Sequence, residues 1–410
     1  MKDFRKLLKL TWKRYAIWLI LVGFFFTLSN TLGVKSNLKW DAFRITDNVR
    51  QMEKYLGEEK THLDDEKFDE KYLKEAEKTA ESFAKKYKLT YRKDRGYDED
   101  YFETLNKTDL WDKQNIYEEY MRGMENLEDY KLDFTEKLVS SMALSLIFIM
   151  IVAMGLTSIE ESLNYYDFTR MLPWSKKKEF LMKIGVALVF GLALYIINTG
   201  VGVGVIKGSV FSEIASFKSL GTFFMKSMIS LVSAALVGVS LGLLSGNFLG
   251  HIGLSIIAIG FIEWFKLIIY SFMGIFGDTY PGTFNYAYYN FKDGLSPAQQ
   301  VFLSLINADF AKTPTLWAGL VVALIIAIIA YFLIGRSSAE RSGYMVKNEI
   351  LSEICKWSGI LSLTSILFVI IAGLVGSDEA NIILRVIAYG LSLLISYKLF
   401  DILFKIRLKF

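Results

Sequence analysis

The sequence predicts an all-α polytopic membrane protein with about eight transmembrane helices. Apolar residues make up 52% of its 410 residues, a share above that of an average soluble domain. They concentrate in runs of roughly 20 residues, the length that crosses the hydrocarbon core of a bilayer. Helices are expected because open strands would leave backbone groups unpaired in lipid. The expected spans are 15–34, 137–157, 184–206, 222–245, 251–275, 315–335, 357–376 and 381–400.

Residues 1–34 are expected to hold an amphipathic helix and the first span. In the stretch 2–14, apolar side chains such as Phe4 and Trp12 recur on one helical face, while the lysines and arginines fall mostly elsewhere. This pattern is typical of a helix that lies on an anionic inner leaflet. The start also resembles a secretory signal, but no small-x-small cleavage site follows the apolar run, so we expect the span to be retained.

Basic residues beside the apolar runs predict the orientation of the chain. If the N-terminus is inside, most of the lysines and arginines near the spans fall in the inner segments, as the positive-inside rule requires. Both termini are then cytoplasmic, and the chain is a multi-pass protein of the plasma membrane. Its richness in lysine, isoleucine, phenylalanine and tyrosine suggests a bacterial source. The expected inner segments are 1–14, 158–183, 246–250, 336–356 and 401–410.

Residues 35–134 are polar and are expected to form an extracellular α-helical insert after the first span. Apolar residues between Phe68 and Tyr87 recur at three- and four-residue steps, and a second helical stretch is expected at about 109–130. The sequence 133–136 resembles a capping box that opens the next helix. The alternative for this region is a solvated, partly disordered loop.

The sequence lacks the motifs of common catalytic and cofactor sites. It contains no GxxxxGKS/T or HExxH motif. Cys355 is its one cysteine, and its two histidines are far apart, which argues against disulfides and against a histidine-rich metal site. A net charge of +4 is too small to indicate nucleic-acid binding. We therefore expect no catalytic, cofactor or metal residues in this chain, and no enzymatic activity of its own.

Charged and small residues inside the spans are further candidates. Glu263 and Lys266 lie three residues apart in the fifth expected span, where they can pair and reduce the cost of placing charge in lipid. They fit either a translocation path or a structural ion pair between helices. In the fourth span, Gly238, Gly242 and Gly246 predict close helix packing, within the chain or between chains.

The loop 159–183, between the second and third spans, is a candidate docking site for a soluble partner. Glu160 and Glu161 close the second span, and a Leu-Pro break precedes a helix start at Ser175. An ordinary basic loop held by lipid phosphates is the alternative. The candidate docking residues are Tyr166, Asp167, Phe168, Arg170, Met171, Leu172 and Pro173.

These features together resemble the permease of a type-2 ATP-binding-cassette (ABC) exporter. In that family an amphipathic interface helix precedes the first span. The loop after the second span often ends in Leu-Pro-x-Ser with basic residues, as residues 172–176 do here, and a lysine such as Lys183 stands at the next span. A short membrane-dipping helical pair follows the fifth span on the outside, and the aromatic stretch 277–314 fits that place.

The resemblance implies that the chain works with other subunits. The loop 159–183 would carry a coupling helix that docks on a separate ATPase, and that partner would bind ATP and magnesium. A second permease, identical or homologous, would complete the path across the lipid. The resemblance covers residues 1–34 and 137–335, while eight spans instead of six and the large insert depart from the family pattern.

We therefore expect an ATP-driven exporter permease whose substrate is a peptide, a lipid or an antimicrobial. One alternative is a secondary transporter that uses Glu263 and Lys266. Another is a non-transporting sensor or immunity protein whose domain 35–134 binds a ligand. The expected order of domains is an interface helix and first span (1–34), the insert (35–134), a transmembrane core (135–335), and a cytoplasmic amphipathic segment with two extra spans (336–410).

Overall fold

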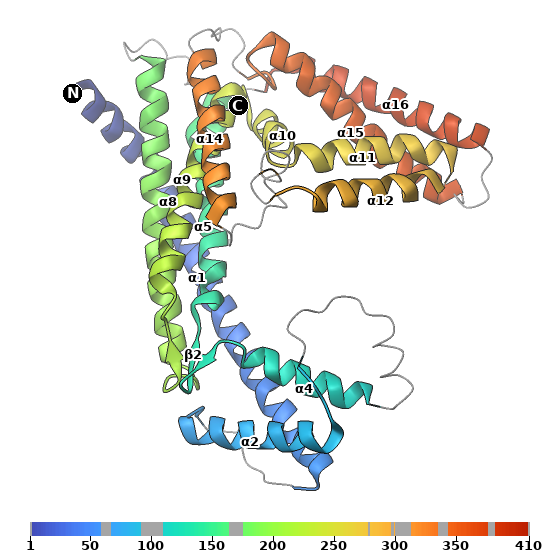
Figure 1. Cartoon of the computed structure of the whole chain (residues 1–410). Coiled ribbons are helices and arrows are strands. Elements are labelled where there is room, and N and C mark those ends of the chain that lie inside the picture. Colours follow the sequence, from blue (N-terminus) through green and yellow to red (C-terminus); the bar gives the residue numbers. More distant parts are fainter. Residues whose placement is uncertain are drawn as a thin grey trace. The chain divides into compact units, whose positions relative to one another are not determined.

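The computed structural model shows a helical protein with the helices of a multi-pass membrane protein (Figure 1). In the part of the chain that it describes, seven helices are long and apolar enough to cross a membrane. A bent helix pair, Phe248–Ala258 with Glu263–Phe276, raises that number to eight if the pair counts as one span. The predicted membrane character is thereby confirmed. The described residues are 2–58, 67–91, 110–163, 175–277, 279–296, 299, 313–334, 343–375 and 382–408.

Two compact units are assembled from interleaved parts of the chain. The first unit consists of Met1–Ile20, Leu146–Leu192 and Met225–Phe410. The second unit consists of Leu21–Ser145 and Ala193–Phe224. Each unit therefore draws on stretches that are far apart in sequence, and each is described by itself below.

Helix α1 (Lys2–Leu56) is continuous through the expected ends of the amphipathic helix and of the first span. No proline interrupts this stretch, so nothing in the local sequence forces the backbone to leave the helical conformation. The part of α1 beyond Leu21 belongs to the second unit. The polar insert therefore begins on the same helix as the first apolar run, without a linker between them.

Two further helices of the insert pack on α1 in the second unit. Helix α2 (Glu70–Tyr87) is the helix predicted from the spacing of Phe68 to Tyr87, and its N-cap Asp69 accepts a hydrogen bond of 2.6 Å from the amide of Tyr72. Helix α4 (Trp111–Gly123) is shorter than the predicted stretch 109–130. Their apolar faces meet α1 in one core, whose largest buried side chains include Met52, Leu73, Phe83, Phe134, Leu138, Ile206, Phe211 and Ile214.

A small sheet replaces the end of the predicted second helix. Strands β1 (Leu127–Glu128) and β2 (Lys131–Asp133) form an antiparallel hairpin, and β3 (Ala215–Ser216) pairs parallel with β2. The two turn residues, Asp129 and Tyr130, have positive φ values of 47° and 57°. Such a pair of left-handed residues is typical of a tight two-residue hairpin turn, which ends helical hydrogen bonding at this point. The prediction of helix to residue 130 was therefore wrong.

Asp133 fixes the end of this sheet, although not through the predicted capping box. The following 3₁₀ helix, η1 (Thr135–Leu138), has Phe134 at its N-cap and no side-chain cap. Asp133 instead accepts hydrogen bonds from the amides of Thr135 (2.9 Å) and Ser219 (3.1 Å). Burial alone would raise the pKa of Asp133, but the hydrogen bonds from Thr135 and Ser219 together outweigh burial and hold it below its ordinary value.

The first unit contains most of the long apolar helices. The α5 helix (Val139–Met154) enters it at Leu146 and continues through a π-helical turn, η2 (Gly155–Ile159), into the short α6 (Glu160–Ser162). The others that contribute to it are α8 (Lys176–Lys207), α9 (Leu220–Leu244), α10 (Phe248–Ile259), α11 (Phe261–Met273), η3 (Gly274–Phe276), α12 (Thr279–Asp293), α14 (Thr313–Ile334), α15 (Glu349–Val375) and α16 (Ile382–Lys405).

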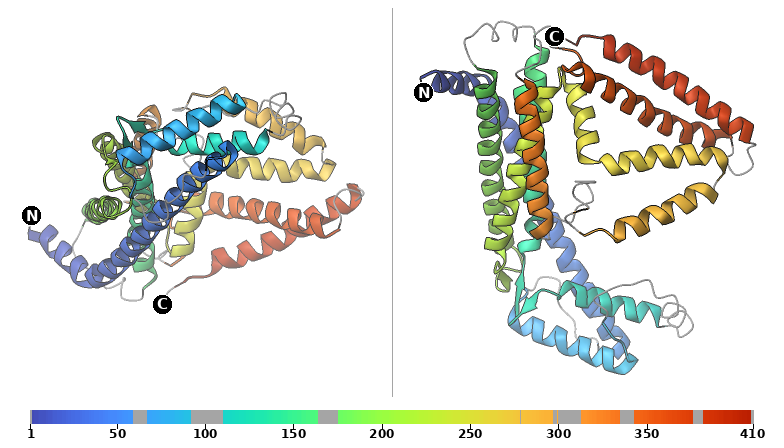
Figure 2. Two further views of the ribbon diagram at one scale, coloured as in Figure 1. Left: turned by 90° about the horizontal axis from the view of Figure 1, so that it is seen from below. Right: turned by 45° about the horizontal axis from the view of Figure 1, so that its top comes forward.

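The last two spans pack closely against each other and against α11. Figure 2 shows α15 and α16 side by side in both of its views. A Cβ atom on Gly359 of α15 would overlap the ring of Phe400 on α16, so glycine at this position permits the close approach of the two helices. The Trp264 indole of α11 donates a hydrogen bond to Ser362 of α15. The two spans beyond residue 335 are therefore packed into the first unit.

Glycines of α9 let neighbouring helices of the first unit approach closely. A Cβ atom on Gly238 would lie 2.9 Å from the sulfur of Met150, and one on Gly242 would overlap Thr157 and approach His251. Small residues commonly permit this kind of contact between membrane helices, where no hydrophobic effect drives helices together. The close packing predicted at these glycines is confirmed, and it occurs within the chain.

We expect Asp133→Asn to destabilise the full chain by about 1 kcal/mol at pH 7, because the amide is a weaker acceptor than the carboxylate for the amides of Thr135 and Ser219. Since the pKa of Asp133 is lowered in the folded state, its stabilisation is present above the ordinary value of 3.8 and is lost as the pH falls through the lowered value.

The gap in melting temperature between wild type and Asp133→Asn should thus narrow below about pH 4. Thermal unfolding of the purified full chain between pH 3 and pH 8 measures it. Glu75→Gln, at an exposed position of α2, is the matched control and should leave the profile unchanged. A gap that is independent of pH would contradict the role given to the carboxylate.

Candidate functional site

The candidate docking loop is defined by the described residues on its two sides. The predicted docking residues all lie in 164–174, outside the described residues. The chain enters this loop from the π-helical turn η2 and the short α6, and it leaves at Ser175 into α8.

The π-helical turn orients the two acidic residues that end the second span. A π turn contains one residue more than an α turn, and such turns are frequent at functional sites. In this turn, the hydroxyl of Thr157 donates a hydrogen bond to the carbonyl of Ala153, and that of Ser158 donates one to the carbonyl of Met154. The side chains of Glu160 and Glu161 that follow are both buried in the first unit.

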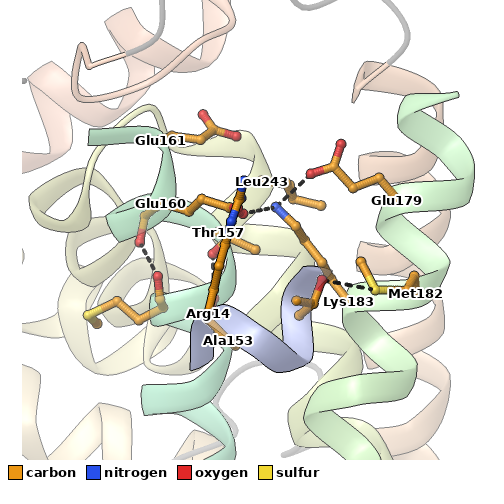
Figure 3. A network of polar contacts seen from close by, with 12 residues as sticks. Arg14, Ala153, Thr157, Glu160, Glu161, Glu179, Met182, Lys183 and Leu243 are labelled. Atoms are coloured by element: carbon orange, nitrogen blue, oxygen red, sulfur yellow. Dashed lines mark hydrogen bonds and ion pairs between the residues drawn. The ribbon is translucent and has the colours of Figure 1, made fainter. Parts of the chain in front are cut away.

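Glu160 lies between two basic residues from different helices. Its carboxylate accepts a hydrogen bond of 2.8 Å from the Lys183 ammonium of α8 and one of 3.2 Å from the Arg14 guanidinium of α1. Lys183 also lies 2.8 Å from Glu179, one turn earlier on α8. Figure 3 shows Lys183 pointing between Glu160 and Glu179. This chain of charges connects the two ends of the docking loop directly, because Glu160 lies at the start of the segment 159–183 and Lys183 lies at its end.

Glu161 pairs with a basic residue that is distant in sequence. Its carboxylate, which is 0% exposed, accepts a hydrogen bond from Lys347, which is 4% exposed. Lys347 also donates to the carbonyl of Leu243 at the end of α9, at 2.8 Å. Both partners are thus removed from solvent.

Backbone pairing places Lys347 at this position. A β-bridge joins Ser245 to Val346, and the amide of Lys347 donates to the carbonyl of Leu244. In the segment that was predicted as a cytoplasmic amphipathic stretch, 336–356, residues 343–347 therefore pair with the turn between α9 and α10, and residues 349–356 form the first turns of α15 (Glu349–Val375). The paired residues extend from Gly343, whose amide donates to Gly246.

The cluster of Arg14, Glu160, Glu161, Glu179, Lys183 and Lys347 is called the ion-pair network below. It consists of the connected set Arg14–Glu160–Lys183–Glu179 and the separate pair Glu161–Lys347. Three acidic and three basic side chains contribute, so the formal charges balance. Balance matters because a buried charge without a partner costs several kcal/mol, about 3–5 when one member of a buried pair is removed. Chemically, the ion-pair network joins four chain segments without leaving an uncompensated charge among these six residues.

The second pair of predicted site residues lies elsewhere in the first unit. Glu263 and Lys266 belong to α11, which begins after a break at Gly260 where the two halves of the fifth span bend by 83°. They lie near the start of α11 rather than in the middle of a continuous span. Both side chains are directed to α12, the helix that follows.

Aromatic hydroxyls of α12 are the partners of these charges. Tyr288 donates a hydrogen bond of 2.6 Å to Glu263, and Lys292 lies 3.8 Å from the same carboxylate. The Lys266 ammonium lies 3.2 Å from the hydroxyl of Tyr289 and over the rings of both tyrosines, at 4.5 and 4.4 Å from their centroids. The structure therefore gives Glu263 and Lys266 partners on α12, where the sequence predicted that they pair with each other.

Lys266 also lines a cavity of about 280 Å³ between α11 and α12. Its walls are apolar and aromatic apart from the Lys266 and Tyr288 head groups. Among the described residues, no group of three or more histidine, cysteine, aspartate or glutamate side chains is placed to hold a metal ion.

Sequence reasoning identified part of the ion-pair network and missed its connections. Glu160 and Glu161 stood out as an acidic pair after an apolar run, and Lys183 as a lysine at the next span. The partner roles of Arg14, Glu179 and Lys347 were missed. Lys347 is 186 positions from Glu161, and a pattern of local spacing gives no signal for a contact of that kind.

Comparison with known protein families, with curated proteins and with solved structures gave no match. The class that the fold itself defines is a helical multi-pass membrane protein.

We expect Lys347→Met or Glu161→Gln to lower the free energy of unfolding by about 3–5 kcal/mol, since each removes the opposite charge from a buried charged partner. The double variant Glu161→Leu with Lys347→Met removes both charges and should recover most of that loss. Thermal unfolding of the detergent-solubilised chain measures all three.

The control for this series is Lys74→Met, which removes one member of the exposed pair between Glu70 and Lys74. It should cost less than about 1 kcal/mol. If the double variant were less stable than both single variants, the ion pair would not be the source of the single-variant loss.

Proposed function

We propose that the chain is the membrane-spanning permease subunit of an ATP-driven ABC exporter in the plasma membrane. A separate ATPase docks on the loop 159–183, and that subunit binds ATP and magnesium and performs the hydrolysis. The observation that carries the proposal is the ion-pair network, which fastens both ends of this loop to the rest of the first unit.

The physical argument concerns transmission of force. An ATPase can drive a permease only if its ATP-bound state favours one permease conformation over another. If the ends of the docking loop were not bonded to the helices, a movement of the partner would deform only the loop and would not move the helices. Glu160 at the start of the loop and Lys183 at its end are hydrogen-bonded to each other, so a displacement of the loop acts on α6 and α8 together. Through Glu161 and Lys347 it also acts on the end of α9.

The helix pair α11–α12 supports the same proposal at another place in the first unit. The described part of the predicted outer segment, 277–314, includes α12, which packs on α11. The exporter family has a short helical pair after its fifth span, as the resemblance implies. The cavity beside Lys266 offers an apolar, aromatic wall with one cation. In this proposal it contacts the exported peptide, lipid or antimicrobial.

A second permease copy or a homologous permease completes the proposed transporter. The described helices of the first unit expose many large apolar side chains, for example Leu374 on α15 and Leu394 on α16. Such surfaces suit lipid or a second membrane subunit. The chain itself has no catalytic step in this scheme.

The central test is recovery of an ATPase. The full chain, purified from its own host in mild detergent, should bring down a protein that hydrolyses ATP. If no ATP-hydrolysing subunit were recovered, the proposal would be wrong.

The docking surface is tested by introducing negative charge at two of its apolar positions. In the recovered complex, Phe168→Glu with Leu172→Glu should weaken ATPase binding at least tenfold or uncouple hydrolysis from transport, because an apolar docking face does not accept two carboxylates. Transport and hydrolysis are measured together in proteoliposomes. Glu75→Lys on α2 is the control and should keep wild-type coupling. Full coupling in the Phe168 and Leu172 variant would place the docking site elsewhere.

A further inference from the structure

A cavity of about 550 Å³ lies between α1 and α4 in the second unit and has no part in the mechanism above. Its volume is within the range of pockets that hold small ligands. On the α1 side it is lined by side chains that share one helical face, including Trp40, Asp47, Asn48 and Gln51. Glu119 closes it from α4.

Asn48 is the feature of this cavity that packing alone does not explain. Its side chain is 5% exposed, and its amide nitrogen has no hydrogen-bond partner among the described residues. Buried amides are normally paired, because an unpaired donor loses its hydration without compensation. Gln51 on the same face is engaged, since it donates a hydrogen bond of 2.6 Å to Asp47. An acceptor supplied by a ligand would satisfy Asn48.

The charge of the cavity favours a cation. Asp47 and Glu119 contribute two carboxylates, and within the described part of the chain Glu119 has no ion-pair partner. Arg44 is the basic residue in the lining, and its guanidinium lies 3.5 Å from Asp41, whose carboxylate also pairs with Lys137. The two carboxylates of the lining therefore exceed its basic side chains by one charge. The insert 35–134 as a whole has more acidic than basic residues, although the complete chain carries +4.

The aromatic wall of the cavity is exposed. Trp40 and Phe43 are 67% and 61% exposed, and their rings meet edge to face with centroids 5.9 Å apart. Aromatic side chains at the end of a membrane helix commonly anchor it at the lipid interface. Here they share a helical face with three polar residues that line the same cavity, and a tryptophan face also attracts lysine and arginine cations.

We propose that this cavity binds a short cationic peptide. A main-chain carbonyl of such a peptide accepts a hydrogen bond from the side-chain amide of Asn48. The lysine or arginine head groups of the peptide pair with Asp47 and Glu119. Its apolar side chains cover Trp40 and Phe43. A lipid phosphate fits less well, because the two carboxylates repel an anion. The proposal stands on the second unit alone and does not depend on whether an ATPase is recovered.

One other occupant is chemically plausible, the chain's own segment 92–109. It connects α2 to α4 and lies outside the described residues. It begins with the basic residues Arg92, Lys93 and Arg95, although its six acidic residues outnumber its four basic ones overall. The binding experiment separates the two occupants.

The experiment uses the full chain in a neutral maltoside detergent and a fluorescein-labelled pentapeptide, Lys-Phe-Lys-Gly-Lys, with blocked termini. Fluorescence anisotropy should show saturable binding that weakens as salt is raised. A matched peptide with glutamate at the three lysine positions should bind at least tenfold more weakly. Equal binding of the two peptides, or no binding of the cationic one, would overturn the proposal.

Variants locate the site. Asp47→Asn with Glu119→Gln should weaken binding of the cationic peptide at least tenfold, and Asn48→Leu should weaken it severalfold, each with a melting curve that shows the chain is folded. Glu75→Gln with Glu81→Gln removes the same charge from exposed positions of α2 and should bind as wild type does. Wild-type affinity in the Asp47 and Glu119 variant would overturn the proposal.

The chain's own segment is tested by replacement of residues 92–109 with a glycine-serine linker of equal length. If the cationic peptide bound only after that replacement, the natural occupant would be segment 92–109, and the assignment of this cavity to a peptide ligand would be wrong.

Discussion

The burial of Glu161 against Lys347 is the interaction on which the first unit depends. Neither charge is tolerable alone in a buried position, so each requires the other. Their pairing in turn requires that residues 343–347 lie beside the end of α9, which the bridge between Ser245 and Val346 maintains. One ion pair thereby fixes the relation of the second expected span to the chain that begins α15.

Different interactions stabilise the two units. In the second unit, apolar side chains of α1, α2 and α4 share one core, and burial from water supplies the driving force. Helices of the first unit are apolar on outer faces as well, so burial distinguishes one arrangement from another only weakly. There, close contacts at Gly238 and Gly242 and the ion-pair network specify which helices meet.

The sequence predicted what local spacing determines. Apolar runs and three- to four-residue periodicity gave the long helices and α2. The hairpin at Leu127–Asp133 was missed because its strands are only two and three residues long, too short to show an alternating pattern. The third strand of the sheet, β3, follows more than 80 residues later and is only two residues long. The glutamate partners were missed for the same reason, since Arg14 and Lys347 reach them from distant segments. The bend at Gly260 was missed because apolar residues continue on both sides of it.

The bend at Gly260 changes the meaning of the charges that follow it. A straight fifth span would hold Glu263 and Lys266 at mid-depth in lipid, where only their mutual pairing offsets the cost. A helix broken at Gly260 leaves backbone groups without helical partners, which a membrane tolerates only against protein or a watery cavity. Helix α12 supplies that protein, and its tyrosines bond both charges. In the proposed transporter, substrate contact at α11–α12 and force from the docking loop therefore act at separate places in the first unit.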